Sequence, residues 1–168
     1  VVAEWDVSKT IGVDNVTATL YKTQKFDVIK PTYKLIISGK GAVKEYSNVT
    51  DCPWNTYYNK IVQLEIREDV SEVLGIAFSN LEKLEIVQIN GNLNFGNNTF
   101  YNSDVEFFCH ENTSTYGAIQ NLGYTLSSLC SENVTEWSVK TKKSCEEDEV
   151  LTGTCLRCAK ILEKIGES

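Results

Sequence analysis

The fold is decided by two similar stretches, Ile61-Val-Gln-Leu-Glu-Ile66 and Leu84-Glu-Ile-Val-Gln-Ile89. When the two are aligned, Leu64 matches Val87, which lies 23 residues further along the chain, and the final isoleucines match as well. Similarity at a fixed period of this length is typical of stacked repeats, in which each unit opens with a short strand whose alternate residues point inward. One unit cannot bury its own apolar side, so its neighbours must cover it.

The similarity continues beyond the strands. Gly75 matches Gly96, Phe78 matches Phe100, and a third, shortened copy begins at Val105-Glu-Phe107. The pattern therefore predicts a short leucine-rich stack of about two and a half units, which is too few to be stable without caps. The alternative is a plain antiparallel sheet in which the similarity is accidental.

The residues before the repeats predict an N-terminal β cap over residues 1–58. Val16-Thr-Ala-Thr-Leu-Tyr21 and Tyr33-Lys-Leu-Ile-Ile-Ser38 are rich in β-branched and aromatic residues, so both are expected to be strands. Gly39-Lys-Gly41 follows the second run and predicts a tight turn, because glycine accepts a positive φ.

The repeats and a helical end-cap are expected to fill residues 59–127. Ser114 or Thr115 can cap the N-terminus of a helix, and Gly123 suits the left-handed residue beyond its C-terminus. This helix would close the open end of the stack.

Residues 128–168 are expected to form a small cysteine-stapled module. Ile161, Leu162 and Ile165 have helical spacing and predict a short amphipathic helix there. The whole chain is therefore predicted to be α+β and mainly β.

The cysteines indicate an oxidising compartment, since an even number in a chain of this size is typical of exported proteins. Cys52 and Cys109 are expected to pair, which leaves four cysteines for the tail. Those four could bind zinc through a closing Cys-x2-Cys, but zinc sites usually have two close pairs, so disulfides are favoured and no metal is expected. The disulfide candidates are Cys52, Cys109, Cys130, Cys145, Cys155 and Cys158.

Glycosylation sequons agree with export. The candidate sites are Asn15, Asn48, Asn97, Asn112 and Asn133. The chain contains no methionine and begins at Val1, which leads us to expect a start after removal of a signal peptide or after trimming. We expect a secreted or cell-surface glycoprotein.

The charge pattern excludes two classes of partner. The formal net charge is −7 and the basic residues occur singly among acids, whereas nucleic acids and anionic membranes need clustered cations. The apolar stretch Val73-Leu-Gly-Ile-Ala-Phe78 is far shorter than the ~18–20 residues of a membrane span, so no direct membrane insertion is expected.

The order of several motifs resembles a known family. Tyr33-Lys-Leu-Ile-Ile-Ser-Gly-Lys-Gly-Ala-Val-Lys-Glu-Tyr46 is followed by Pro53-Trp54 and by a repeat that ends in Gly75-Ile-Ala-Phe78. This order is similar to that of the BspA-like leucine-rich repeat proteins, which occur on the surfaces of bacteria and some protozoa. Such proteins carry a glycine-containing strand-turn, a Pro-Trp, and repeats that end in Gly-x2-Ala-Phe.

The resemblance extends to the C-terminal part. The segment Tyr116–Tyr124 resembles the helical end-cap of such arrays, and Trp137-Ser-Val with the later cysteines resembles small cysteine modules that follow them. The chain departs from the family in its few repeats and in carrying Cys52 and Cys109. The family implies attachment to proteins of a host or of neighbouring cells, and brings no catalytic residues.

No catalytic or cofactor motif emerges from the sequence. His110 is the single histidine and follows Cys109, but adjacent side chains on a strand point to opposite faces, so a surface histidine beside a structural cysteine is expected. We therefore expect neither an enzyme nor a cofactor.

The leading hypothesis is a protein-binding or adhesion module. Recognition is predicted to come from the strand face, where polar residues alternate with inward apolar ones; the candidates are Tyr57, Tyr58, Gln63, Glu65, Glu85 and Gln88. One alternative is an extracellular hydrolase or its carbohydrate-binding appendix, with glycan binding. Another is a structural spacer or assembly unit.

Overall fold

The computed structural model describes residues 1–23, 31–101, 104–130, 134, 136–141, 148–156 and 159–166. Its larger part is a nine-stranded sheet and its C-terminal part a three-stranded sheet. The elements of the larger part are β1 (Ala3–Asp6), β2 (Asn15–Lys22), β3 (Tyr33–Ala42), η1 (Val49–Asp51), η2 (Asn55–Lys60), β4 (Ile61–Ile66), β5 (Val70–Val73), β6 (Ile86–Ile89), β7 (Asn94–Phe95), β8 (Glu106–Cys109), α1 (Ser114–Asn121) and β9 (Thr125–Ser128). The C-terminal strands are β10 (Trp137–Thr141), β11 (Val150–Thr154) and β12 (Ile161–Ile165).

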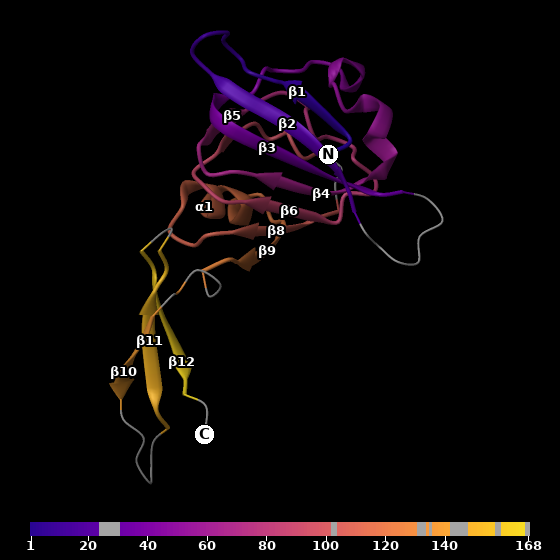
Figure 1. Ribbon diagram of the computed structural model, residues 1–168. Coiled ribbons are helices and arrows are strands. Elements are labelled where there is room, and N and C mark those ends of the chain that lie inside the picture. The colour runs from indigo at the N-terminus through magenta and orange to yellow at the C-terminus, as the bar shows by residue number, and fades with distance from the viewer. Residues whose placement is uncertain are drawn as a thin grey trace.

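The main sheet changes from antiparallel to parallel at β3. Its strands follow the order β1-β2-β3-β4-β6-β8-β9, and Figure 1 shows them stacked one below another. The first three pair antiparallel, whereas each pair from β3 to β9 is parallel. The predicted match of Leu64 with Val87 is confirmed as a register pair of β4 and β6. The alternative of a plain antiparallel sheet is wrong for this part of the chain.

The parallel register begins one rung earlier than the sequence predicts. Leu35 of β3 pairs with Leu64 of β4, although the two are 29 residues apart and fall outside the 23-residue period. The sheet thus runs without a break across the predicted boundary at residue 58. The inward rows form the core, with Leu35, Ile37, Leu64, Ile66, Val87, Ile89, Phe107 and Cys109 all buried.

An aromatic column crosses the stack behind the strands. The rings of Trp54 and Phe78 are stacked at 5.5 Å between centroids, and those of Phe78 and Phe100 at 5.8 Å. All three side chains are fully buried. Trp54 therefore occupies, before β4, the place that phenylalanine takes in the two later units, so the Pro-Trp motif belongs to the first rung.

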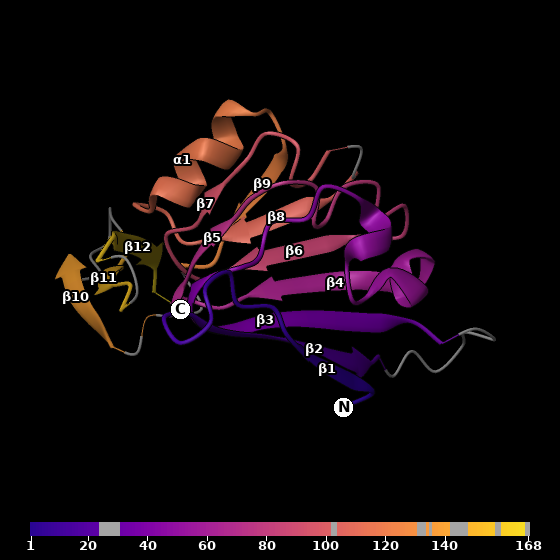
Figure 2. The ribbon, with the colours of Figure 1, turned by 90° about the horizontal axis from the view of Figure 1, so that it is seen from above.

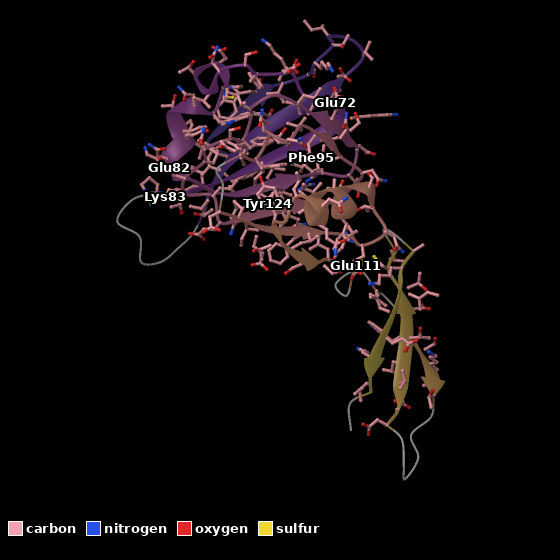
Figure 3. All side chains as sticks on the ribbon, turned by 180° about the vertical axis from the view of Figure 1, so that it is seen from behind. Glu72, Glu82, Lys83, Phe95, Glu111 and Tyr124 are labelled. Carbon is pink, nitrogen blue, oxygen red and sulfur yellow. The ribbon has the colours of Figure 1, made fainter. Side chains whose placement is uncertain are left out.

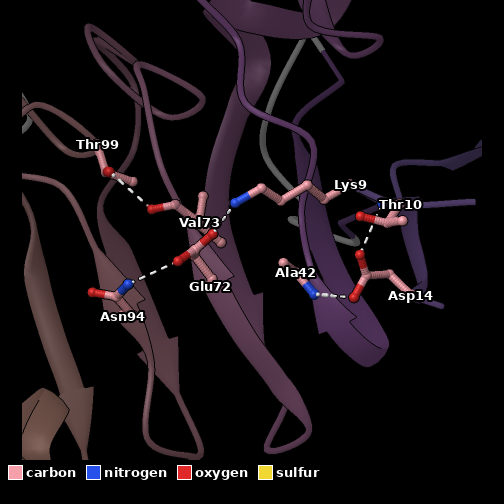
Figure 4. A network of polar contacts seen from close by, with 8 residues as sticks. All are labelled: Lys9, Thr10, Asp14, Ala42, Glu72, Val73, Asn94 and Thr99. Carbon is pink, nitrogen blue, oxygen red and sulfur yellow. Dashed lines mark hydrogen bonds and ion pairs between the residues drawn. The ribbon is translucent and has the colours of Figure 1, made fainter.

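A second, shorter row of parallel strands lies beside the first. β5 pairs with the end of β3 and with β7. Figure 4 shows the polar contacts that fix this row: Glu72 binds Lys9 and accepts a hydrogen bond from Asn94 Nδ2 at 2.8 Å. Thr99 Oγ1 donates to the carbonyl of Val73 at 3.2 Å.

The predicted turn at residues 39–41 is wrong, because these residues continue β3. Gly39 and Gly41 have φ of 108° and 112°, so the expected positive φ occurs within a strand. A Cβ on Gly39 would lie 1.9 Å from the carbonyl oxygen of Asn15. The glycines therefore allow close approach of the neighbouring strand rather than a reversal of the chain.

The predicted end-cap helix is confirmed as α1. Thr113 is its N-cap, with Oγ1 accepting from the backbone N–H of Tyr116 at 3.2 Å, and Gly123 follows with φ of 78°. Figure 2 shows α1 at the β8 and β9 end of the sheet. The chain then adds β9 to the stack, so the helix precedes the last rung.

The predicted C-terminal helix is wrong. Ile161–Ile165 is β12, which pairs antiparallel with β11, and β11 pairs antiparallel with β10. The side chain of Lys164 lies over the Trp137 ring, with Nζ 4.5 Å from its centroid. The isoleucines at helical spacing are two-thirds exposed, so no apolar surface is available to hold a helix. Among the described residues, no helix is long and apolar enough to cross a membrane.

Candidate functional site

The solvent-facing side of the parallel strands carries two ordered rows of side chains. The register aligns Lys34, Gln63, Ile86, Glu106 and Thr125 in one row. A second row contains Ile36, Glu65, Gln88, Phe108 and Ser127. All but one of these side chains are half-buried, in contrast to the fully buried residues that alternate with them.

Polar contacts fix the side chains of this face. Glu65 binds two cations, with Oε2 2.6 Å from Lys34 Nζ and Oε1 3.0 Å from Arg67 Nε. Gln88 Nε2 donates to Asn90 Oδ1 at 2.8 Å. The face is therefore ordered before any partner binds, which lowers the entropy lost on association.

A shallow hollow of about 270 Å³ lies in the middle of the face. Leu64, Ile86, Phe108 and Leu129 supply its apolar lining, and Lys34, Gln63 and Gln88 its polar groups. An apolar surface with a few amide groups around it is the composition of a site that accepts an apolar side chain.

The structure places only part of the predicted set on this face. Gln63, Glu65 and Gln88 lie there as expected, and their role in binding stays a prediction. Glu85 does not, because it precedes β6 and its position alternates with Ile86 and Gln88.

The two predicted tyrosines also lie elsewhere. Tyr57 and Tyr58 are on η2 and pack against the core, with the Tyr57 ring 5.2 Å from that of Tyr33. Burial raises the pKa of Tyr58 to about 12. Placing them on the strand face was wrong, because η2 ends before β4 begins.

Sequence reasoning missed Ile86 and Phe108. Alternation assigns apolar residues to the core, and both residues are apolar on the solvent side. The one signal was the register itself: aligned with Gln63, Ile86 takes an outward position.

The predicted pairing of Cys52 with Cys109 is contradicted, since both are free buried thiols. Cys52 lies near the carbonyl of Ala77 beside Trp54, whereas Cys109 ends β8. The two are thus held on different parts of the stack. Burial raises the pKa of each thiol to about 12. Cys145 and Cys158 lie outside the described residues.

Four of the predicted glycosylation sites are exposed, and their modification stays a prediction. They are Asn15, Asn48, Asn97 and Asn112. Asn133 lies outside the described residues.

His110 is not the surface residue that the sequence predicts. Its side chain is 2% exposed, and burial lowers its pKa. It lies with Cys130 and Cys155, both buried, so that the ligand atoms of all three are within 4.8 Å of one another. His110 Nδ1 is 3.7 Å from Cys155 Sγ. The expected partner, Cys109, points to the opposite side of β8.

Comparison with known proteins gives little. No family model matches the sequence. No curated protein matches it. A leucine-rich repeat protein of known structure from Eubacterium ventriosum is similar over 90% of this chain and 48% of that one, with 14% sequence identity and a TM-score of 0.40. The chain thus spans about half the length of that protein.

Proposed function

We propose that this chain is a protein-binding module of the leucine-rich repeat type, secreted or displayed at a cell surface, that uses the solvent-facing side of β4, β6 and β8. The observation that carries the proposal is the ordered face with its half-buried Ile86 and Phe108. Exposed apolar side chains within a fixed polar frame are typical of the centre of a protein interface. The resemblance to BspA-like proteins supports the same hypothesis, and attachment to a host or neighbouring-cell protein is the role it implies.

The chemistry of the hollow defines the partner it fits. Gln63 and Gln88 offer amide groups that both donate and accept, while the charges of Lys34 and Arg67 are opposed by Glu65. A protein segment with one apolar side chain between main-chain polar groups matches this arrangement. A strongly charged ligand does not.

The carbohydrate-binding alternative finds less support. It needs exposed aromatic rings beside an acidic cleft, but the tryptophans of the described chain are engaged elsewhere. Trp54 is buried, Trp5 lies beside Tyr57 at 6.3 Å between centroids, and Trp137 lies beneath Lys164.

The experiment compares binding of the whole chain and of Phe108→Ala to extracellular proteins of co-occurring cells. A candidate partner is purified and its Kd measured with the wild-type chain, with Phe108→Ala and with Tyr101→Ala, an exposed aromatic outside the face. Loss of a central interface anchor weakens binding by more than about tenfold. We expect that loss for Phe108→Ala and unchanged binding for Tyr101→Ala.

Two outcomes contradict the proposal. Equal binding by both variants would remove the sheet face from recognition. Binding on a glycan array, together with no purified protein partner, would favour the carbohydrate alternative. Thermal unfolding of both variants controls for loss of the fold.

A further inference from the structure

The cluster of His110, Cys130 and Cys155 draws its members from three separate segments. His110 directly follows β8, Cys130 lies two residues after β9, and Cys155 directly follows β11. The first two belong to the end of the main sheet and the third to the C-terminal sheet. Their side chains are 2%, 0% and 1% exposed, so three ligand atoms meet at a point closed to solvent.

The separations fit one tetrahedral metal ion. With Zn–S bonds of about 2.3 Å and Zn–N bonds of about 2.0 Å, tetrahedral angles place nitrogen and sulfur ligands about 3.5 Å apart and two sulfurs about 3.8 Å apart. The observed distance from His110 Nδ1 to Cys155 Sγ is 3.7 Å, and every pair lies within 4.8 Å. Movements of less than about 1 Å would complete this geometry.

The surroundings favour thiolates and hold the ligands in place. The backbone N–H of Glu111 donates to Cys130 Sγ at 3.3 Å, a contact that stabilises a negative sulfur. Cys155 begins a tight turn in which its carbonyl accepts from Ala159 N and its own N–H donates to Lys160 O, both at 2.9 Å. Lys160 in turn forms an ion pair with Glu111, which Figure 3 labels at the junction of the two sheets. Outer contacts of this kind orient the ligands of metal sites.

We infer that His110, Cys130 and Cys155 bind a structural Zn²⁺ ion that joins the end of the stack to the C-terminal sheet. Thiolate and imidazole ligands select zinc over calcium or magnesium, and the closed surroundings fit a structural site rather than a catalytic one. The sequence favours disulfides because its cysteines are unevenly spaced, but the histidine comes from a strand 20 residues before Cys130 and no spacing rule includes it. Cys145 and Cys158 lie outside the described residues, so the fourth ligand is assigned by experiment.

The first test measures metal in the unmodified, reduced full-length chain. After incubation with Zn²⁺ and removal of the excess, we expect one zinc per chain in native mass spectrometry and elemental analysis. Replacement by Co²⁺ should give the intense visible bands of a tetrahedral site and a thiolate-to-cobalt charge-transfer band. A reduced chain that retains no metal overturns the inference. So does a chain, isolated without reductant, whose mass is lower by two hydrogens and whose peptide map joins Cys130 to Cys155.

The second test assigns the ligands. Cys130→Ser, Cys155→Ser and His110→Ala should each weaken zinc affinity by more than about 100-fold, beyond the effect of changing an outer contact. Cys52→Ser is the matched control, since it removes a buried thiol far from the cluster and should retain one zinc. Applied to Cys145 and Cys158, the same substitution identifies the fourth ligand by loss of charge-transfer intensity. Equal zinc binding by Cys155→Ser and Cys52→Ser would overturn the assignment even if one variant unfolds more readily, because metal content is measured on the wild-type chain as well.

Discussion

Replacement of Phe78 by leucine tests whether the aromatic column holds the repeats together. The Phe78 ring is fully buried and stacks on Trp54 on one side and on Phe100 on the other. Leucine keeps the position apolar but removes both ring contacts. Each aromatic pair contributes about 0.5–1.5 kcal/mol beyond its buried area, so the free energy of unfolding should fall by about 1–3 kcal/mol. Alanine, which also leaves a cavity, should lower it by about 3–5 kcal/mol.

Equilibrium unfolding in urea, followed by tryptophan fluorescence, measures the effect, because Trp54 adjoins the mutated ring. The matched control is Tyr101→Leu, the same kind of change at a side chain that is 56% exposed in the turn after Phe100. A surface change of this kind should stay within about 0.5 kcal/mol. If Phe78→Leu and Tyr101→Leu are equally stable, the column does not hold the units together and the reasoning is refuted.

Three further outcomes follow from glycine geometry and from burial. Gly39→Ala should lower the free energy of unfolding by about 2–5 kcal/mol through backbone strain and the clash with Asn15, whereas Gly117→Ala, on open helix surface, should raise it by about 0.5–1 kcal/mol; chemical denaturation measures both. Burial raises the pKa of Tyr46 from 10.0 to about 12, so the folded state binds more protons than the unfolded state between those values. Stability should therefore fall by about 2–3 kcal/mol as pH rises from about 10 to 12, and Tyr46→Phe should remove that part of the fall. Because burial raises the pKa of Cys52 to about 12, an alkylating reagent near neutral pH should leave it unmodified in the native chain and modify it in denaturant, as peptide mapping will report.

The period of the repeats could be predicted because two strands of one type face the same core. Leu64 and Val87 occupy one row, and a 23-residue interval returns each to the same place. The first rung escaped prediction for a physical reason. Between Leu35 and Leu64 the chain also forms η1 and η2, which lengthens the interval to 29 residues and substitutes Trp54 for the expected phenylalanine. Stacking depends on the register of the strands and not on the length of the connection.

Other errors arose where a local pattern had two physical outcomes. Positive φ at Gly39 fits a turn, but it also fits a strand whose neighbour approaches too closely for a side chain. The spacing of Ile161 and Ile165 fits a helix, yet a strand places the same residues on one side as well, because four is also a multiple of two. Tertiary pairing with β11 decided the second case.

The site was the least predictable part, because its members come from distant strands. Ile86 and Phe108 meet through the pairing of β6 with β8. His110, Cys130 and Cys155 meet only after the C-terminal sheet has docked on the end of the stack. A pattern of cysteines alone suggested disulfides, since the histidine that changes the chemistry is remote in sequence from the pair that it joins.

The two proposals meet at the end of the main sheet. Leu129 lines the hollow and the next residue, Cys130, belongs to the cluster, while Phe108 lies two residues before His110. A stack of so few units has an open end at β9, and an open sheet edge must be covered or paired to avoid aggregation. A zinc ion that ties β8, β9 and β11 together would close that end and fix the backbone on which Phe108 and Leu129 stand. The cysteine segment then serves recognition indirectly, by holding the last rungs in the geometry that the binding face requires.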